Sequence, residues 1–188
     1  PEYEGGEFVV CHAHYRNRPA YEEGHIPGAV EVDTNTLESP ETWNRRSPEE
    51  LKSALERLGI TENTTVILYG RFSFPDQSDP FPGSSAGHLG AIRAAFIMMY
   101  AGVKDVRVLN GGLRSWEDAG YEISTREVTA RKRGEFQAPV PGRPGLAVDV
   151  PEAKKIIASS GAELVSVRSW PEYTGEVSGY NYIEKKGR

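Results

Sequence analysis

The only cysteine of this 188-residue chain lies beside two histidines, in the run Cys11-His12-Ala13-His14. A cysteine thiolate is a nucleophile, and a neighbouring imidazole can activate it by lowering the pKa of the thiol. Adjacent residues of a strand point to opposite faces, however, so His12 is poorly placed to serve Cys11. We therefore expect Cys11 to be a small buried residue that fills space in a strand. A reactive cysteine–histidine pair is the alternative.

Three other positions could carry chemistry. His25 precedes the run Ile26-Pro27-Gly28, and it has no second histidine or acidic partner at a metal-ligand spacing. We expect its ring to hydrogen-bond backbone carbonyls and fix the turn, rather than to act as a base or a ligand. Trp116 is expected in the core, with a substrate platform as the alternative, and the sequence assigns no role to His88. A single cysteine also excludes an internal disulfide and any CxxC site.

The residues that could do chemistry lie among alternating strands and helices. Runs rich in branched apolar residues predict four strands, at 7–13, 30–33, 65–69 and 106–109. Helical patterns separate the third strand from its neighbours on both sides. This alternation predicts an α/β fold, in which a parallel sheet carries helices on both faces.

Two helices are predicted with a core-facing stripe. The run Ser47-Pro48-Glu49-Glu50 has the residues of a capping box with proline at the first helical position, and Gly59 fits a helix end. The stripe of this first helix consists of Leu51, Ala54, Leu55 and Leu58. In the second helix the expected core face consists of Leu89, Ile92, Phe96 and Met99.

A connection of about 16 residues, from Phe72 to Gly87, joins the third strand to the second helix. Compact domains rarely hold structureless connections beyond about 12–15 residues unless these bind something or are disordered. Phe72, Phe74 and Phe81 stand among prolines in this connection. A docking or lid role and mobile disorder both remain open.

The chain is predicted to have three parts. Residues 1–125 form the α/β domain, and the polar, proline-containing residues 126–144 form a linker whose basic start is solvated. In residues 145–188 the pattern restarts, with a helix from Asp149 to Ile157 and a strand at 163–167. Because so short a segment cannot close a sheet alone, we expect it to pack on the first domain, to pair with another chain, or to be the ordered part of a nicked longer protein.

Two runs about 80 residues apart carry a family resemblance. Tyr21 to Val30, which contains His-Ile-Pro-Gly-Ala, and the run Asn110-Gly111-Gly112-Leu113-Arg114-Ser115-Trp116 resemble the two signature segments of the rhodanese (thiosulfate sulfurtransferase) family. The tandem arrangement looks most like the non-catalytic repeats of multi-domain bacterial sulfurtransferases. The resemblance implies a rhodanese-like fold, followed by the linker and a partial second repeat.

The resemblance also implies where the nucleophile should lie. In family members, the loop that follows the strand corresponding to residues 65–69 contains a cysteine. The thiolate of this cysteine attacks the outer sulfur of a donor and becomes a persulfide, and the reaction needs no cofactor or metal. Here that loop begins with Gly70 and Arg71. Glycine has no nucleophile, so this loop is expected to be degenerate and the chain to contain no catalytic residue. The catalytic cysteine is expected beyond Arg188.

The start of the second repeat contains three residues that could face a substrate or a neighbouring domain: Arg168, Trp170 and Glu172. The resemblance implies that Arg168 supports the catalytic loop. Glu172 stands where thiosulfate-using members place an arginine that clamps the anionic donor, and a carboxylate would repel that dianion. Either the donor differs, or another cation supplies the clamp, or this repeat is inactive. An ordinary helix start with surface charge is the other interpretation.

Composition limits the partners. Acidic residues outnumber basic ones by 27 to 22, which argues against nucleic acid and other polyanions. The longest apolar stretch, Ala94 to Ala101, is too short to span a membrane. We expect a segment of a sulfurtransferase whose small sulfur-containing substrate binds at an interdomain cleft formed with the rest of its own chain or with a second chain. A non-catalytic protein-binding module is the alternative, and the compartment (bacterial cytoplasm or periplasm) is left open.

Overall fold

The computed structural model describes residues 7–71 and 87–177. These residues form two compact units, of which the first ends at Leu146 and the second begins at Ala147. The proposed division into domain, linker and partial repeat stays a prediction. The expectations for the connection that starts at Phe72 concern residues outside the described ranges.

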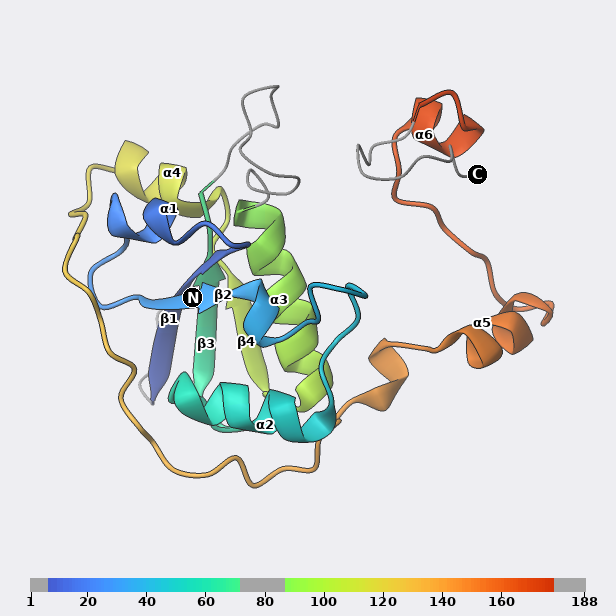
Figure 1. The fold of residues 1–188 in the computed structure, drawn as a ribbon, viewed down its shortest axis with the longest axis horizontal. Helices are drawn as coiled ribbons and strands as arrows, with labels where there is room; N and C mark the ends of the chain where they lie inside the picture. Colours follow the sequence, from blue (N-terminus) through green and yellow to red (C-terminus); the bar gives the residue numbers. More distant parts are fainter. Residues whose placement is uncertain (1–6, 72–86, 178–188) are drawn as a thin grey trace. The chain divides into compact units, whose positions relative to one another are not determined.

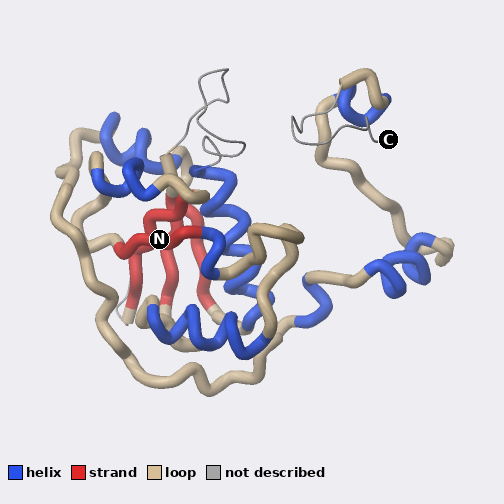
Figure 2. Tube along the Cα trace, in the orientation of Figure 1, coloured by secondary structure: helices blue, strands red, loops and turns tan. Residues whose placement is uncertain are grey.

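The first unit contains a four-stranded sheet in the order β2-β1-β3-β4 (Figures 1 and 2). Every neighbouring pair is parallel, so the carboxyl ends of all strands meet at one edge. The predicted α/β class and the four strands are confirmed, and the observed bounds are β1 Phe8–His14, β2 Val30–Asp33, β3 Thr65–Tyr69 and β4 Asp105–Val108.

Both faces of the sheet are covered at its centre. In the register of β1 and β3, Cys11 is paired with Leu68 and His12 with Tyr69, and all four residues are fully buried. Because successive residues alternate between faces, the first pair lies on one face and the second pair on the other. The helices of this unit are α1 Arg18–Glu22, α2 Pro48–Arg57, α3 Gly87–Ala101 and α4 Gly112–Asp118, with 3-10 turns at Thr34–Thr36 and Pro144–Leu146.

These helices divide between the two faces. α3 packs against β1, β3 and β4, and α2 lies beside α3 (Figure 1). On the face of Tyr69, a buried cluster joins that ring to Ile26, Ala29 and Leu113 of α4. α2 begins as predicted, because the Ser47 side chain and Glu50 form a reciprocal capping box. None of the described helices is long and apolar enough to cross a membrane.

The predicted core face of α3 is wrong. Leu89 and Ile92 are 69% and 48% exposed, and Phe96 and Met99 are only partly buried. The helix instead turns its small residues inward, and its buried positions are Gly87, Gly90, Ala91, Ala94, Ala95, Ile97, Met98, Tyr100 and Ala101. Small side chains let the helix backbone approach the sheet closely. The stripe of large apolar residues therefore predicted the wrong face of α3 as the buried one.

Residues 126–143, which we call the strap, lie along the first unit rather than free in solvent (Figure 2). The Val128 amide donates to the Tyr21 hydroxyl, and the Arg133 guanidinium donates to the carbonyls of Gly59 and Phe8. Phe136 is fully buried. The polar, proline-containing composition that predicted a solvated linker did not reveal these anchors, because only Phe136 among them contributes a large apolar side chain.

The second unit contains two short helices among its described residues, α5 Val150–Ile157 and α6 Trp170–Thr174. The helix after Asp149 is confirmed. The predicted strand at 163–167 is wrong, since these residues join no sheet and Leu164 and Val167 are 79% and 98% exposed. A strand needs a partner for its backbone hydrogen bonds, and the described residues of this unit offer none.

Candidate functional site

The position after β3, where a nucleophile would be expected, has no room for a side chain. A Cβ atom built on Gly70 would lie 2.1 Å from the Gly87 carbonyl oxygen and 2.9 Å from that of Ala13. Both contacts are with backbone, which cannot swing away as the end of a side chain can. Gly70 is therefore required by packing, and a cysteine does not fit there without a shift of the main chain.

Three glycines meet at this point, and we call Gly70, Gly87 and Gly112 the glycine junction. A Cβ on Gly87 would lie 2.7 Å from the Arg71 carbonyl oxygen, and one on Gly112 would lie 2.5 Å from the Gly70 oxygen. Gly112 also has φ +61°, a conformation that favours glycine. The Leu113 amide donates to the Gly70 carbonyl at 3.0 Å, and the His88 amide to that of Arg71 at 3.1 Å. The junction thus closes the end of β3 against the starts of α3 and α4.

Cys11 is a structural residue, as expected. Its side chain is fully buried, and burial raises the pKa of the thiol to about 12. A thiol with such a pKa is protonated at neutral pH, and the thiolate is the reactive form. His12 does not activate it, because the two side chains lie on opposite faces of β1.

His12 is fully buried between aromatic rings, with its centroid 5.0 Å from that of Tyr69 and 5.6 Å from that of Tyr21. Neither ring nitrogen has a hydrogen-bond partner among the residues that the structure describes. Burial, followed by the nearby charges of His14 and Arg71, lowers the pKa of His12 to about 3. The imidazole is therefore neutral, with one donor and one acceptor available.

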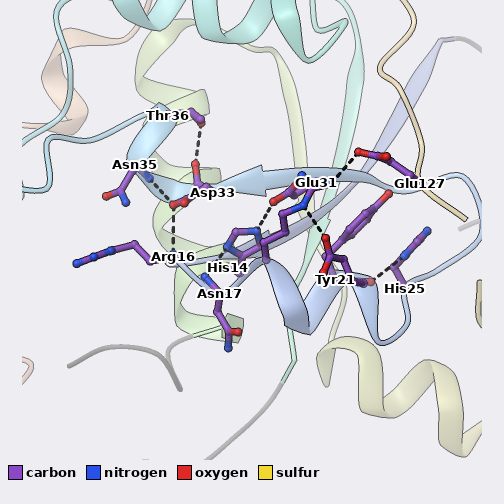
Figure 3. Close-up of polar contacts among 12 residues, drawn as sticks. His14, Arg16, Asn17, Tyr21, His25, Glu31, Asp33, Asn35, Thr36 and Glu127 are labelled. Atoms are coloured by element: carbon purple, nitrogen blue, oxygen red, sulfur yellow. Dashed lines mark hydrogen bonds and ion pairs between the residues drawn. The ribbon is translucent and has the colours of Figure 1, made fainter. Parts of the chain in front are cut away.

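His14, two residues along the same face of β1, has both nitrogens engaged (Figure 3). The Asn17 amide donates to Nδ1 at 3.1 Å, so the ring proton is on Nε2, which donates to Glu31 at 2.8 Å. The same Glu31 accepts from Arg18, which also bonds Glu22 and, in the strap, Glu127. This network ties α1, β2 and the strap together and leaves His14 no free lone pair.

His25 holds the turn that precedes β2, as expected. Its Nδ1 lies 3.0 Å from the Tyr21 carbonyl oxygen and its Nε2 lies 3.0 Å from that of Arg126 (Figure 3 shows the first contact). The ring also stacks on the Tyr21 ring at 4.0 Å. Trp116 is half-buried against the Tyr69 cluster, where its indole N–H donates to the Glu122 carbonyl.

A cavity of about 180 Å³ opens at the carboxyl edge of the sheet. His12, His14 and Gly87 line it, together with Asn17, Glu23 and Arg71. The Arg71 guanidinium is fixed by donating to the carbonyls of Ala20 at 2.9 Å and Gly24 at 3.3 Å. In the sequence, His12 and His14 stand out only as neighbours of Cys11. Strand alternation, which places residues i and i+2 on one face, was the signal that could have paired them.

Residues 14–119 match the protein family described as "Rhodanese-like domain". This match covers more than half of the chain and includes β2, β3, β4 and the glycine junction.

The chain belongs to the rhodanese-like family.

Sulfurtransferases of this family resemble the chain over most of its length. It is 41% identical over 184 residues to "Thiosulfate sulfurtransferase YnjE" of Escherichia coli, covering 97% of the chain and 39% of the relative. It is 34% identical over 161 residues to "Sulfur carrier protein TtuD" of Thermus thermophilus, covering 84% and 51%. The chain thus spans about half or less of the length of these relatives.

Solved structures of EanB share the rhodanese-like architecture. The wild-type EanB structure superposes on the whole chain with a TM-score of 0.95 and 66% sequence identity, and the chain covers 44% of EanB. Other EanB structures are described as complexes with hercynine, and one as a cysteine persulfide with ergothioneine. These similarities support sulfur transfer as the general chemistry of the relatives.

In the second unit the residues expected near a substrate lie around the start of α6. Arg168 donates to the Ser166 hydroxyl at 3.1 Å, and its guanidinium lies 5.8 Å from the Tyr173 ring. The Glu172 carboxylate accepts from the Ser169 amide and hydroxyl, which makes it part of a helix cap. Trp170 is 71% exposed. The helix-start interpretation agrees with these contacts, and the substrate-side role stays a prediction.

Proposed function

We propose that this rhodanese-like chain is the non-catalytic part of a larger sulfurtransferase. In that enzyme a cysteine outside residues 1–188 takes sulfane sulfur from thiosulfate or a similar donor as a persulfide. It then passes this sulfur to a thiophilic acceptor. The first unit would form a wall of the substrate cleft and a docking surface for the catalytic part of the protein.

One observation carries the proposal: the chain has no cysteine that can form a persulfide. Cys11 is its only cysteine, it is fully buried, and its thiol stays protonated at neutral pH. The position after β3 is Gly70, where packing excludes a side chain. Two longer relatives, named as a sulfurtransferase and a sulfur carrier protein, further support it; the matched part is 39% of one and 51% of the other.

The resemblance to EanB suggests an acceptor. EanB is 66% identical over the whole chain, and its structures include hercynine and ergothioneine complexes. We therefore propose hercynine as the first acceptor to test in the whole protein. The position of Glu172 argues that a dianionic donor is not clamped by the start of the second unit, so thiosulfate should be compared with a sulfane-sulfur donor of lower negative charge.

The test is turnover by the whole protein from each donor to hercynine, with and without the change Cys11→Ala. The proposal predicts that turnover persists when Cys11 is replaced. If turnover disappears while the variant keeps its fold by circular dichroism, Cys11 is the nucleophile and the proposal fails. If the whole protein neither turns over nor forms a persulfide, the alternative of a non-catalytic binding module is favoured.

A further inference from the structure

The cavity at the carboxyl edge of the sheet has no part in the proposed sulfur transfer, because none of its lining residues is a cysteine. It nevertheless combines three features of a binding site: a buried polar group without a partner, a fixed cation and a helix N-terminus. All three come from described residues of the first unit.

The first feature is His12. The ring is fully buried, lines the cavity, and has no hydrogen-bond partner at either nitrogen within residues 7–71 and 87–177. Leaving a buried donor or acceptor unsatisfied costs about 1–3 kcal/mol. A polar molecule in the cavity that accepts a hydrogen bond from the imidazole N–H removes part of that cost.

The second feature is positive charge. The Arg71 guanidinium is held at the cavity wall by the carbonyls of Ala20 and Gly24, so it is already oriented before any ligand arrives. α3, a helix of 15 residues, begins at Gly87 on the same wall. The His88 amide of this first turn already donates to the Arg71 carbonyl, so what the helix start offers an anion is the partial positive charge of its N-terminus.

A carboxylate limits how much negative charge the cavity accepts. Glu23 also lines it, with an oxygen 4.0 Å from the Arg71 guanidinium and a side chain that is 69% exposed. This charge partly offsets Arg71 and repels a dianion more strongly than a monoanion. The volume of about 180 Å³ holds a few water-sized groups, since one water occupies about 30 Å³ of liquid.

From these contacts we propose that the cavity binds a small monocarboxylate, of the size of formate or acetate, with the His12 imidazole and the Arg71 guanidinium as its hydrogen-bond donors. The ligand would lie against the N-terminus of α3. Gly87 lines the cavity and, as a glycine, adds no side chain to it. This site is independent of the persulfide chemistry.

The test is a ¹H–¹⁵N NMR titration of the full chain with sodium acetate at constant ionic strength. We expect saturable shifts at Gly87 and at the Arg71 side chain, with a dissociation constant in the millimolar range. Arg71→Gln should weaken binding by about tenfold, because it removes a charge-assisted hydrogen bond. His12→Phe, which keeps a ring of similar size but no nitrogen, should weaken it by about three- to tenfold.

A charge-matched pair of variants keeps the proposal testable if the His12 variant does not fold. Glu23→Gln should strengthen acetate binding by about two- to fivefold and sulfate binding by more, since it removes a repelling charge. Glu135→Gln, at an exposed position of the strap that does not line the cavity, should change neither. Linear, non-saturating shifts, or equal effects of the two glutamate variants, would overturn the proposal.

Discussion

Replacing Gly70 by alanine tests whether the packing after β3 requires glycine at this position. The alternative is that glycine merely stands where a catalytic residue is missing. The added Cβ would lie 2.1 Å from the Gly87 carbonyl oxygen and 2.9 Å from the Ala13 oxygen. Ordinary contacts of this kind are longer than 3 Å, so the end of β3 or the start of α3 must move by about 1 Å. Overpacking of this kind costs about 1–3 kcal/mol.

The backbone shift also weakens the hydrogen bonds of the glycine junction. The Leu113 amide bonds the Gly70 carbonyl and the His88 amide bonds that of Arg71, each at 3.0–3.1 Å. Each such bond contributes about 0.5–1.5 kcal/mol. We therefore expect Gly70→Ala to lower the free energy of unfolding by about 2–5 kcal/mol.

The assay is thermal unfolding followed by circular dichroism. For a chain of this size about 1 kcal/mol corresponds to a shift in Tm of about 2–4 °C, so Gly70→Ala should lower Tm by about 5–15 °C. The matched control is Gly145→Ala, because a Cβ at Gly145 meets nothing within 4 Å. Its effect should stay within about 0.5 kcal/mol. Equal Tm values for the two variants would refute the packing argument.

Three further changes test other parts of the fold. Phe136→Ala should destabilise the first unit by about 3–5 kcal/mol in urea unfolding, whereas Tyr121→Ala, at a side chain that is 60% exposed, should have little effect. Ser47→Ala removes the capping box of α2 and should cost about 0.5–2 kcal/mol by the same measurement. Burial lowers the pKa of His12 from 6.5 to about 3. Between these two pH values the His12 imidazole is therefore mostly protonated in the unfolded chain and mostly neutral in the folded chain. Stability should therefore fall between pH 6.5 and 3 by at most about 1.4 kcal/mol per pH unit from this group, and His12→Phe should flatten the urea-midpoint profile over that range.

The sequence predicted the elements whose signals are local. β2 and β3 were found with the observed bounds, and the capping residues of α2 placed the start of that helix. Strands with branched apolar residues and helices with a capping box carry their information within a few residues. The alternation of these elements was then enough to predict a parallel sheet.

Features that depend on distant partners were missed. The inward face of α3 is lined by Gly90, Ala94 and other small residues, which an apolar stripe does not reveal. The strap is held by contacts such as Arg133 with Phe8, which are far apart in the sequence. The expected strand at 163–167 did not form because a strand depends on a neighbour that the described second unit does not supply.

The candidate site was predicted in part. The sequence indicated that Gly70 cannot supply a nucleophile, and the structure adds that three glycines pack together there. It also indicated that Cys11 is buried and that the His25 ring fixes a turn, and both are confirmed. The cavity around His12 was missed because it depends on how β1, α1 and α3 meet.

The most direct test of the central claim is to locate the persulfide in the whole protein. The protein is incubated with each of the sulfur donors named above, digested without reductant and mapped by mass spectrometry, where a persulfide adds about 32 Da to its cysteine peptide. We expect this increase on a cysteine outside residues 1–188 and an unmodified Cys11 peptide. A persulfide on Cys11 would contradict it.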